Sequence, residues 1–205
     1  MKKFELTSES ITKFGRTLFR IKALISFGNV SEGELGGFVE QEENINQSGN
    51  AWVFGDARVF GNARVSGNAE VSGDARVFGD ARVFGNARVS GDARVYGDAW
   101  VSGDARVSTR SHISWFSNVG SENGTLTAYI TKSQEIEVIR GCFQGTIGQF
   151  EAAVQKTHGN SGYGQQYGLL IEFIKLRFLG LTVQIEATQE IVQEDPQETL
   201  QEEIA

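Results

Sequence analysis

The chain has 205 residues, a formal net charge of −7 at pH 7 and a single cysteine, Cys142. One cysteine excludes an internal disulfide and fits a reducing cytoplasm, and no apolar run approaches the roughly eighteen residues of a membrane-spanning helix. The N-terminus lacks the pattern of a secretory signal, so we expect a cytoplasmic protein of one or two small domains with no membrane partner.

Residues 1–48 precede a strict repeat and include the strand-rich stretch KFGRTLFRIKALISF. The repeat that follows predicts a stack of short strands, and the end of such a stack exposes unpaired strand edges that need cover. We therefore expect residues 1–48 to form an N-terminal β cap.

The central segment repeats the same six residues. A glycine stands at every sixth position from Gly49 to Gly103, and each hexad reads Gly-[Asn/Asp]-Ala-x-Val-[Phe/Tyr/Ser], with x mostly arginine. Because Ala and Val alternate with x, they point inward and x points outward. The Gly-Asn/Asp pair favours a corner, since both residues tolerate left-handed backbone angles. A glycine recurs too often for a helix, so the repeat predicts a narrow parallel β-helix.

This pattern resembles the hexapeptide-repeat superfamily of left-handed β-helices, in which an aliphatic residue is followed four positions later by a small one. Val53 with Ala57 fits the pattern, and so does every later pair up to Val101 with Ala105. The resemblance implies a left-handed winding and triangular coils of three hexads each. The phase continues weakly as far as Val119, so we expect the β-helix to occupy residues 49–120.

Residues 121–185 have a different character. The alternation in TLTAYIT and EIEVI predicts paired strands. Thr146 is a candidate N-cap for a helix that ends at Gly159, and a second helix over about 164–178 carries apolar residues. These elements predict a small α+β module, so the fold class is mainly β with a C-terminal α+β part.

The last segment, residues 186–205, is acidic. It holds seven of the 26 acidic residues and no Lys or Arg, so the remaining 19 acids equal the 19 bases. Segments of this composition are typically solvated and mobile. We therefore expect an acidic, mobile tail on a neutral body.

Two stretches outside the repeat carry a second resemblance. Gly33, Gly36, Gly37 and Phe38 before the repeat, and the pieces SNVGS, RGCFQGT and THG after it, resemble hexapeptide-repeat proteins of phages and prophages. Proteins of that type are often described as transferases or as polymer-forming proteins. The resemblance implies a phage-encoded protein that acts in the host bacterial cell.

Taking the hexads three at a time separates three outer faces of the expected coil, and one of them is rich in arginine and aromatic residues. Its members are Arg58, Arg76, Arg94, Phe60, Phe78 and Tyr96. Both residue types are enriched at binding hot spots, and the guanidinium fork suits phosphate. We interpret this stripe as a binding surface, either for self-association as a dimer or trimer or for a protein or nucleotide partner. The acids in the repeat dilute the positive field, so duplex nucleic acid is not expected.

Catalytic candidates are few. Many hexapeptide-repeat proteins are acyltransferases with a histidine base between the subunits of a trimer, and the resemblance makes His112 the candidate here. However, no insertion interrupts the hexads where that family places its cofactor loops. Cys142 and His158 lie sixteen residues apart without a visible third group, so we interpret them as structural. Two histidines and one cysteine are too scattered for a metal site, and we expect neither metal nor cofactor.

These observations favour a non-catalytic binding or scaffold protein. The phage resemblance implies a more specific role, which is to inhibit a host defence system by binding a protein effector or by sequestering a nucleotide signal. Two alternatives remain open: a trimeric acyltransferase that uses His112, and a structural, fibre-like element.

Overall fold

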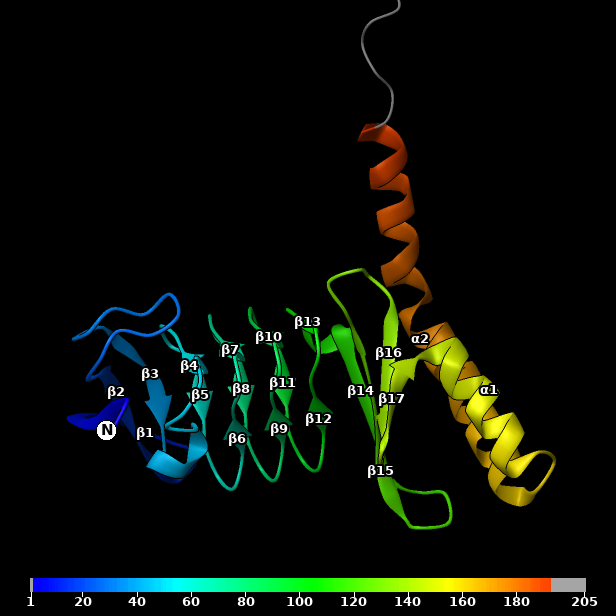
Figure 1. The fold of residues 1–205 in the computed structure, drawn as a ribbon, viewed down its shortest axis with the longest axis horizontal. Helices are drawn as coiled ribbons and strands as arrows, with labels where there is room; N and C mark the ends of the chain where they lie inside the picture. The colour runs from blue at the N-terminus through cyan, green and yellow to red at the C-terminus, as the bar shows by residue number, and fades with distance from the viewer. Residues whose placement is uncertain (1, 193–205) are drawn as a thin grey trace, which may run out of the picture.

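The computed structural model describes residues 2–192, and Figure 1 shows the N-terminal strands, a stack of short strands and a C-terminal sheet with two helices in a row. The N-terminal elements are β1 (Phe4–Lys13), β2 (Arg16–Ala23), β3 (Leu35–Val39) and the short helix η1 (Glu42–Asn44). The repeat forms ten two-residue strands: β4 (Trp52–Val53), β5 (Arg58–Val59), β6 (Arg64–Val65), β7 (Glu70–Val71), β8 (Arg76–Val77), β9 (Arg82–Val83), β10 (Arg88–Val89), β11 (Arg94–Val95), β12 (Trp100–Val101) and β13 (Arg106–Val107).

Strands of the repeat pair in parallel with their counterparts three hexads away. Arg58 of β5 lies opposite Arg76 of β8, and Arg76 lies opposite Arg94 of β11. The same step generates the sheets β13-β10-β7-β4 and β12-β9-β6. The expected coil of three hexads is therefore confirmed, as a parallel β-solenoid of about 4 turns. Its handedness stays a prediction.

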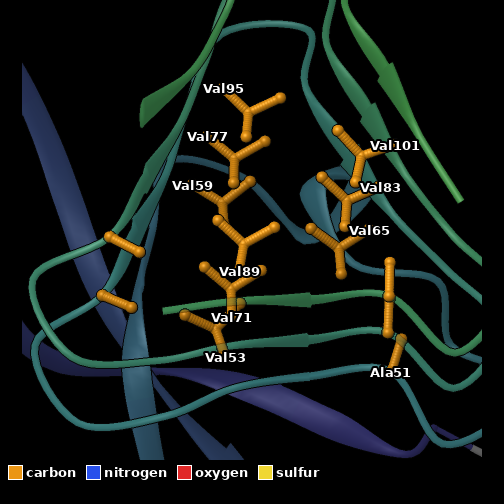
Figure 2. Packing of buried hydrophobic residues seen from close by; sticks show 14 of the residues in the cluster. Ala51, Val53, Val59, Val65, Val71, Val77, Val83, Val89, Val95 and Val101 are labelled. Carbon is orange, nitrogen blue, oxygen red and sulfur yellow. The ribbon is translucent and has the colours of Figure 1, made fainter. Parts of the chain in front are cut away.

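The interior of the solenoid consists of the alanine and valine slots. Every Ala and Val of the repeat from Ala51 to Val107 is fully buried. Figure 2 shows the valines of successive coils stacked directly over one another, for example Val59, Val77 and Val95. These small side chains fill the interior, so a larger side chain in one of the slots would overpack it.

The corners require glycine for two reasons. Gly67 has φ +68°, a left-handed angle, and a Cβ at this position would lie 3.0 Å from the backbone N of Gly85 in the next coil. Side chains stack along one corner as well, because Asn50 Nδ2 donates to Asn68 Oδ1 at 3.1 Å and Asn68 Nδ2 donates to Asn86 Oδ1 at 3.1 Å. The residue after the glycine thus bonds its counterpart in the neighbouring coil.

The N-terminal region extends the solenoid as well as covering it. β3 pairs in parallel with β5, and Ile45 forms a bridge with Val65, so an irregular first coil begins near Leu35, before the first hexad. The β1–β2 hairpin then continues the same sheet, in the order β1-β2-β3-β5-β8-β11. Trp52 stands in an outward slot but is fully buried, since the end of the solenoid is closed over it.

The C-terminal part begins earlier than its expected start at residue 121. β14 (Ile113–Val119), β15 (Gly124–Ile130), β16 (Ile136–Arg140) and β17 (Phe143–Thr146) form one antiparallel sheet in chain order. The last regular solenoid strand is β13, followed by the short helix η2 (Arg110–His112). Thr109 and Trp115 stand where the next two corner glycines would be. Without glycine the chain does not turn into another coil, and residues 113–119 join the antiparallel sheet instead.

This sheet closes the C-terminal end of the solenoid with one face and carries the helices on the other. Tyr129 and Ile139 belong to the solenoid core, and Trp100 N donates to Thr127 Oγ1 at 3.1 Å. On the opposite face Leu126 and Val138 form a second core with side chains of the two helices. One continuous structure therefore runs from the solenoid to the helices.

The helices are α1 (Ile147–His158) and α2 (Gly162–Val192). The cap predicted for α1 is confirmed, because Thr146 Oγ1 accepts a hydrogen bond from Gln149 N and Thr146 N donates to Gln149 Oε1. α2 is longer than the expected 164–178, and it includes residues 186–192 of the expected tail. The rest of that tail, residues 193–205, lies outside the described residues.

Candidate functional site

The three arginines of the predicted stripe lie side by side on one face of the solenoid. Arg58, Arg76 and Arg94 are in register on β5, β8 and β11 and are all half-buried. None of the three forms an ion pair with any residue that the structure describes. We call this set the arginine row.

The aromatic residues form a continuous stack beside the arginine row. The ring centroids of Phe60 and Phe78 are 5.0 Å apart and those of Phe78 and Tyr96 are 4.9 Å apart, with nearly parallel planes. Phe14, from the β1–β2 turn, stacks on Phe60, and Trp115 meets Tyr96 edge-on at 4.4 Å. We call Phe60, Phe78 and Tyr96 the ring row.

The ring row is covered at one end and open at the other. Phe60 is 7% exposed, because it packs against Leu18 and Phe38 of the N-terminal region. Phe78 is half-buried and Tyr96 is 42% exposed. The structure thus brings the six predicted residues together, with Phe60 holding the hairpin on the solenoid and the other two rings nearer the surface.

The electrostatics of this face are unfavourable in the free protein. Burial lowers the pKa of Arg76 from its ordinary value and the positive charges of Arg94, Arg58 and Arg110 lower it further, while the negative charge of Asp74 offsets part of this effect. Arg76 also lies over the ring of Phe14, 5.0 Å from its centroid, which offsets part of this cost. The arginine row is therefore a surface where an added negative charge would be stabilised.

A groove lies on the neighbouring face, where sequence reasoning placed no site. Its floor is formed by the outer side chains of β6, β9 and β12, and one wall is the segment 42–47 that contains η1. The groove has a volume of about 740 Å³, within the usual range for small-molecule sites. Arg64, Arg82 and Trp100 occupy successive x slots on its floor.

The groove combines charge with aromatic surface. The Arg82 guanidinium lies 4.9 Å from the Trp100 ring centroid, and Phe84 meets Trp100 edge-on. Arg64 Nη1 donates to the carbonyl of Glu43 at 2.9 Å. The signal that could have found this site was the serine at position 66, but nothing in the sequence showed that residues 42–47 stand opposite it.

The third face is neutralised. On this face, formed by β4, β7, β10 and β13, Arg88 pairs with Glu70 at 3.2 Å. Arg106 donates to backbone carbonyls, that of Ala105 among them, at 2.8 Å. This face therefore offers less unpaired charge than the other two.

The catalytic candidates gain little from the structure. His112 lies in η2 with Nδ1 3.1 Å from Ser108 Oγ, and no insertion interrupts the coils from β4 to β13. Cys142 is exposed at the turn between β16 and β17, whereas the His158 ring lies near Tyr163 and Tyr167. Within residues 2–192 no hydrogen bond joins Cys142 to His158.

Among the described residues, no group of three or more His, Cys, Asp or Glu side chains is placed to hold a metal ion. None of the helices in the described part of the chain combines the length and apolar character needed to cross a membrane.

Comparison with known proteins bears on the repeat. The model of the YdcK beta solenoid repeat matches residues 57–73, 75–89, 81–97 and 87–103. These segments lie between β5 and β12 and support a repeat β-helix protein. No curated protein matches the chain.

Proposed function

We propose that the protein is a non-catalytic binding scaffold that presents the arginine row and the ring row to an acidic partner. The observation that carries this proposal is the register of Arg58, Arg76 and Arg94, which stand on adjacent strands and form no ion pair with the residues that the structure describes. Like charges directly opposite on neighbouring strands are destabilising, so the free protein stores repulsion that an anionic partner would relieve.

The ring row gives such a partner an apolar contact beside the charges. Phe78 is stacked on both sides, and Tyr96 is held between Phe78 and the edge-on ring of Trp115, so both lose little side-chain freedom when they bind. Arginine and tyrosine are also the residues that dominate binding energy in many interfaces. The rigid solenoid keeps both rows at a fixed spacing, as a scaffold requires.

The identity of the partner is the finer part of the proposal. We propose a phage-encoded protein that blocks a host defence protein with an acidic surface, and this step rests on the sequence resemblance described above. A nucleotide signal is the second partner in the same proposal, because guanidinium groups suit phosphate as well as carboxylate.

Self-association belongs to the proposal too. We expect a dimer or a trimer, because the outer side of α2 carries Leu169 and Phe173 with 75% and 51% exposure. Apolar groups exposed together on one helix are often buried in an assembly. Light scattering of the purified chain measures this directly, and a monomer at all concentrations would contradict it.

The test of the main proposal compares two sets of variants. The protein is used as bait in a bacterial lysate, and the affinity of the captured partner is then measured for the wild type and for a variant with Arg58, Arg76 and Arg94 all changed to Ala. We expect at least a tenfold loss of affinity and a strong dependence on salt. The matched control changes Arg88 and Arg106 on the third face to Ala and should bind normally. Equal binding by the wild type and the triple variant would remove the arginine row from the function.

A further inference from the structure

The groove beside the arginine row has the features of a separate small-molecule site. It exists because the slot after valine holds Ser66 on this face, where the neighbouring face holds Phe60 in the preceding hexad. Phe60 fills the space under the N-terminal hairpin, whereas Ser66 leaves the space next to segment 42–47 open. The small side chain of Ser66 thus leaves room for the groove beside segment 42–47.

The floor of the groove offers aromatic surface at one end. Trp100 and Phe84 are both half-buried, and each keeps part of its ring surface in the groove. Phe84 meets Trp100 edge-on, and the Arg82 guanidinium lies over the Trp100 ring. A planar heterocycle can stack on one of these rings and meet the edge of the other.

The centre of the groove offers positive charge. Arg82 is exposed and forms no ion pair with the residues described here. Arg64 is held against the wall by its bond to the Glu43 carbonyl, which leaves its other guanidinium N–H groups available. Two arginines in successive coils are spaced to contact one phosphate group from adjacent rungs.

The wall of the groove is fixed before any ligand arrives. Glu42 forms an ion pair with Lys2 at 2.7 Å, so its charge is largely compensated. Gln47 Oε1 accepts hydrogen bonds from Lys3 N and Phe4 N. Glu43 lines the groove, is exposed and forms no ion pair in the described part of the chain, so its carboxylate is available to accept hydrogen bonds from hydroxyl or amino groups.

We infer that this groove binds a nucleoside monophosphate or a ligand of the same build, with the planar base stacked on one of the two rings, Trp100 or Phe84, and the phosphate on Arg64 and Arg82. Glu43 then lies on the side where sugar hydroxyls or a base amino group can donate to it. The inference does not depend on the arginine row, which lies on a different face. A variant that loses binding at that row should keep nucleotide binding in the groove.

The test uses isothermal titration of the full chain with AMP, GMP, CMP and UMP as probes, and with adenosine and inorganic phosphate added separately. We expect saturable binding of at least one nucleotide at one site per chain, quenching of Trp100 fluorescence, and at least tenfold weaker binding of adenosine and of phosphate. Absence of saturable binding by all four nucleotides would overturn the inference. Equal affinity for phosphate alone would also overturn it, because the base would then contribute nothing.

Two variants locate the site. Ser66→Phe fills the groove with the side chain that other hexads carry in this slot, so the fold should tolerate it and nucleotide affinity should fall at least tenfold. Ser90→Phe makes the same change on the third face and serves as the matched control with unchanged affinity. Arg82→Ala should weaken the nucleotide more than it weakens adenosine. Unchanged nucleotide binding in a folded Ser66→Phe variant would place the ligand elsewhere and overturn the inference.

Discussion

The arginine row and the groove lie on neighbouring faces of one solenoid and are built from the same hexad. On the first face the slot after valine holds Phe60, Phe78 and Tyr96, which stack without a break. On the second face the same slot holds Ser66, Phe84 and Ser102, so the ring in the middle has a serine in both neighbouring coils. The first face is closed by rings and the second is hollowed by about 740 Å³.

This difference shows which slots of the repeat determine the fold and which determine the surface. The interior alanines and valines are the same beneath both faces and are fully buried (Figure 2). Only the outer slots differ. A face of the solenoid can therefore change from filled to hollow without any change in the coil that supports it.

The N-terminal region also closes the two faces by different means. On the first face Phe14 stacks on Phe60 at 5.5 Å, which is an apolar contact. Next to the groove the contacts are polar, because Lys3 N donates to Gln47 Oε1 and the Lys3 ammonium is buried. Its Nζ donates to the carbonyl of Ala51 at 2.9 Å and lies 4.8 Å from the Phe27 ring centroid.

The largest expected effect is on the free energy of unfolding and concerns this buried lysine. It distinguishes the polar contacts of the N-terminal region next to the groove from its apolar contacts on the first face. Burial lowers the pKa of Lys3 from 10.5 to about 8. Between these pH values the unfolded chain keeps a proton that the folded chain has released, so the free energy of unfolding rises with pH. The shift corresponds to at most about 3 kcal/mol. Urea unfolding at pH 7.5 and pH 10.5 measures the rise.

The control for this prediction is Lys3→Met, which keeps an apolar stem and removes the titrating group. Burial raises the pKa of Tyr129 above its ordinary value of 10. Above pH 10 the unfolded chain therefore loses a proton that the folded chain keeps, and Tyr129 lowers the free energy of unfolding. Tyr129 is present in both proteins, and its contribution cancels when the two pH profiles are subtracted. Identical profiles for the wild type and Lys3→Met would show that Lys3 does not titrate in this range.

The second prediction tests whether the two faces share one interior. Val77 lies beneath the ring row and Val83 lies beneath the groove, and both are fully buried. Val77→Ala and Val83→Ala should each lower the free energy of unfolding by about 2 kcal/mol, from the lost methyl groups and the cavity left behind. Denaturant unfolding of the two variants makes the comparison. A difference larger than about 1 kcal/mol would mean that the interior is not equivalent under the two faces.

The third prediction removes the contrast between the face filled by the ring row and the face hollowed by the groove. Phe78→Ser gives the ring row the interrupted pattern of the groove face and should cost about 1.5 kcal/mol, because two stacked contacts are lost. Phe84→Ser removes a ring that has one edge-on contact and should cost about half as much. Thermal and urea unfolding of both variants give the ratio. Equal costs would show that stacking along the ring row adds nothing to stability.

The sequence predicted the coil well because the repeat shows both the six-residue spacing of the corners and the two-residue alternation of each strand. The glycine at each sixth position marks the corners, and the alternation of Ala, x and Val separates the inside from the outside. The same regularity placed Arg58, Arg76 and Arg94 in register, and the structure confirms that register. The cap of α1 at Thr146 was also visible, because capping depends on neighbouring residues alone.

The parts that the sequence did not predict depend on contacts between distant segments. The groove requires residues 42–47 to stand opposite Ser66, and no local pattern encodes that placement. The burial of Lys3 and Trp52 likewise follows from the closure of the solenoid end, not from their own positions in the sequence. The solenoid was expected to reach residue 120, but its last regular strand ends at Val107. The prediction gave the weak continuation of the apolar phase more weight than the missing glycine at Thr109.

The smallest expected effect separates the unpaired arginines from the paired ones. Arg94→Gln removes one like charge beside Arg76 and should raise the free energy of unfolding by a few tenths of a kcal/mol at low salt. Arg88→Gln breaks the ion pair with Glu70 on the third face and should lower it by about 0.5 kcal/mol. Because both effects arise between partly exposed charges, both should shrink toward zero in 1 M NaCl. Unfolding at two salt concentrations measures the sign of each, and a loss of stability in Arg94→Gln would show that the arginine row carries no repulsion for a partner to relieve.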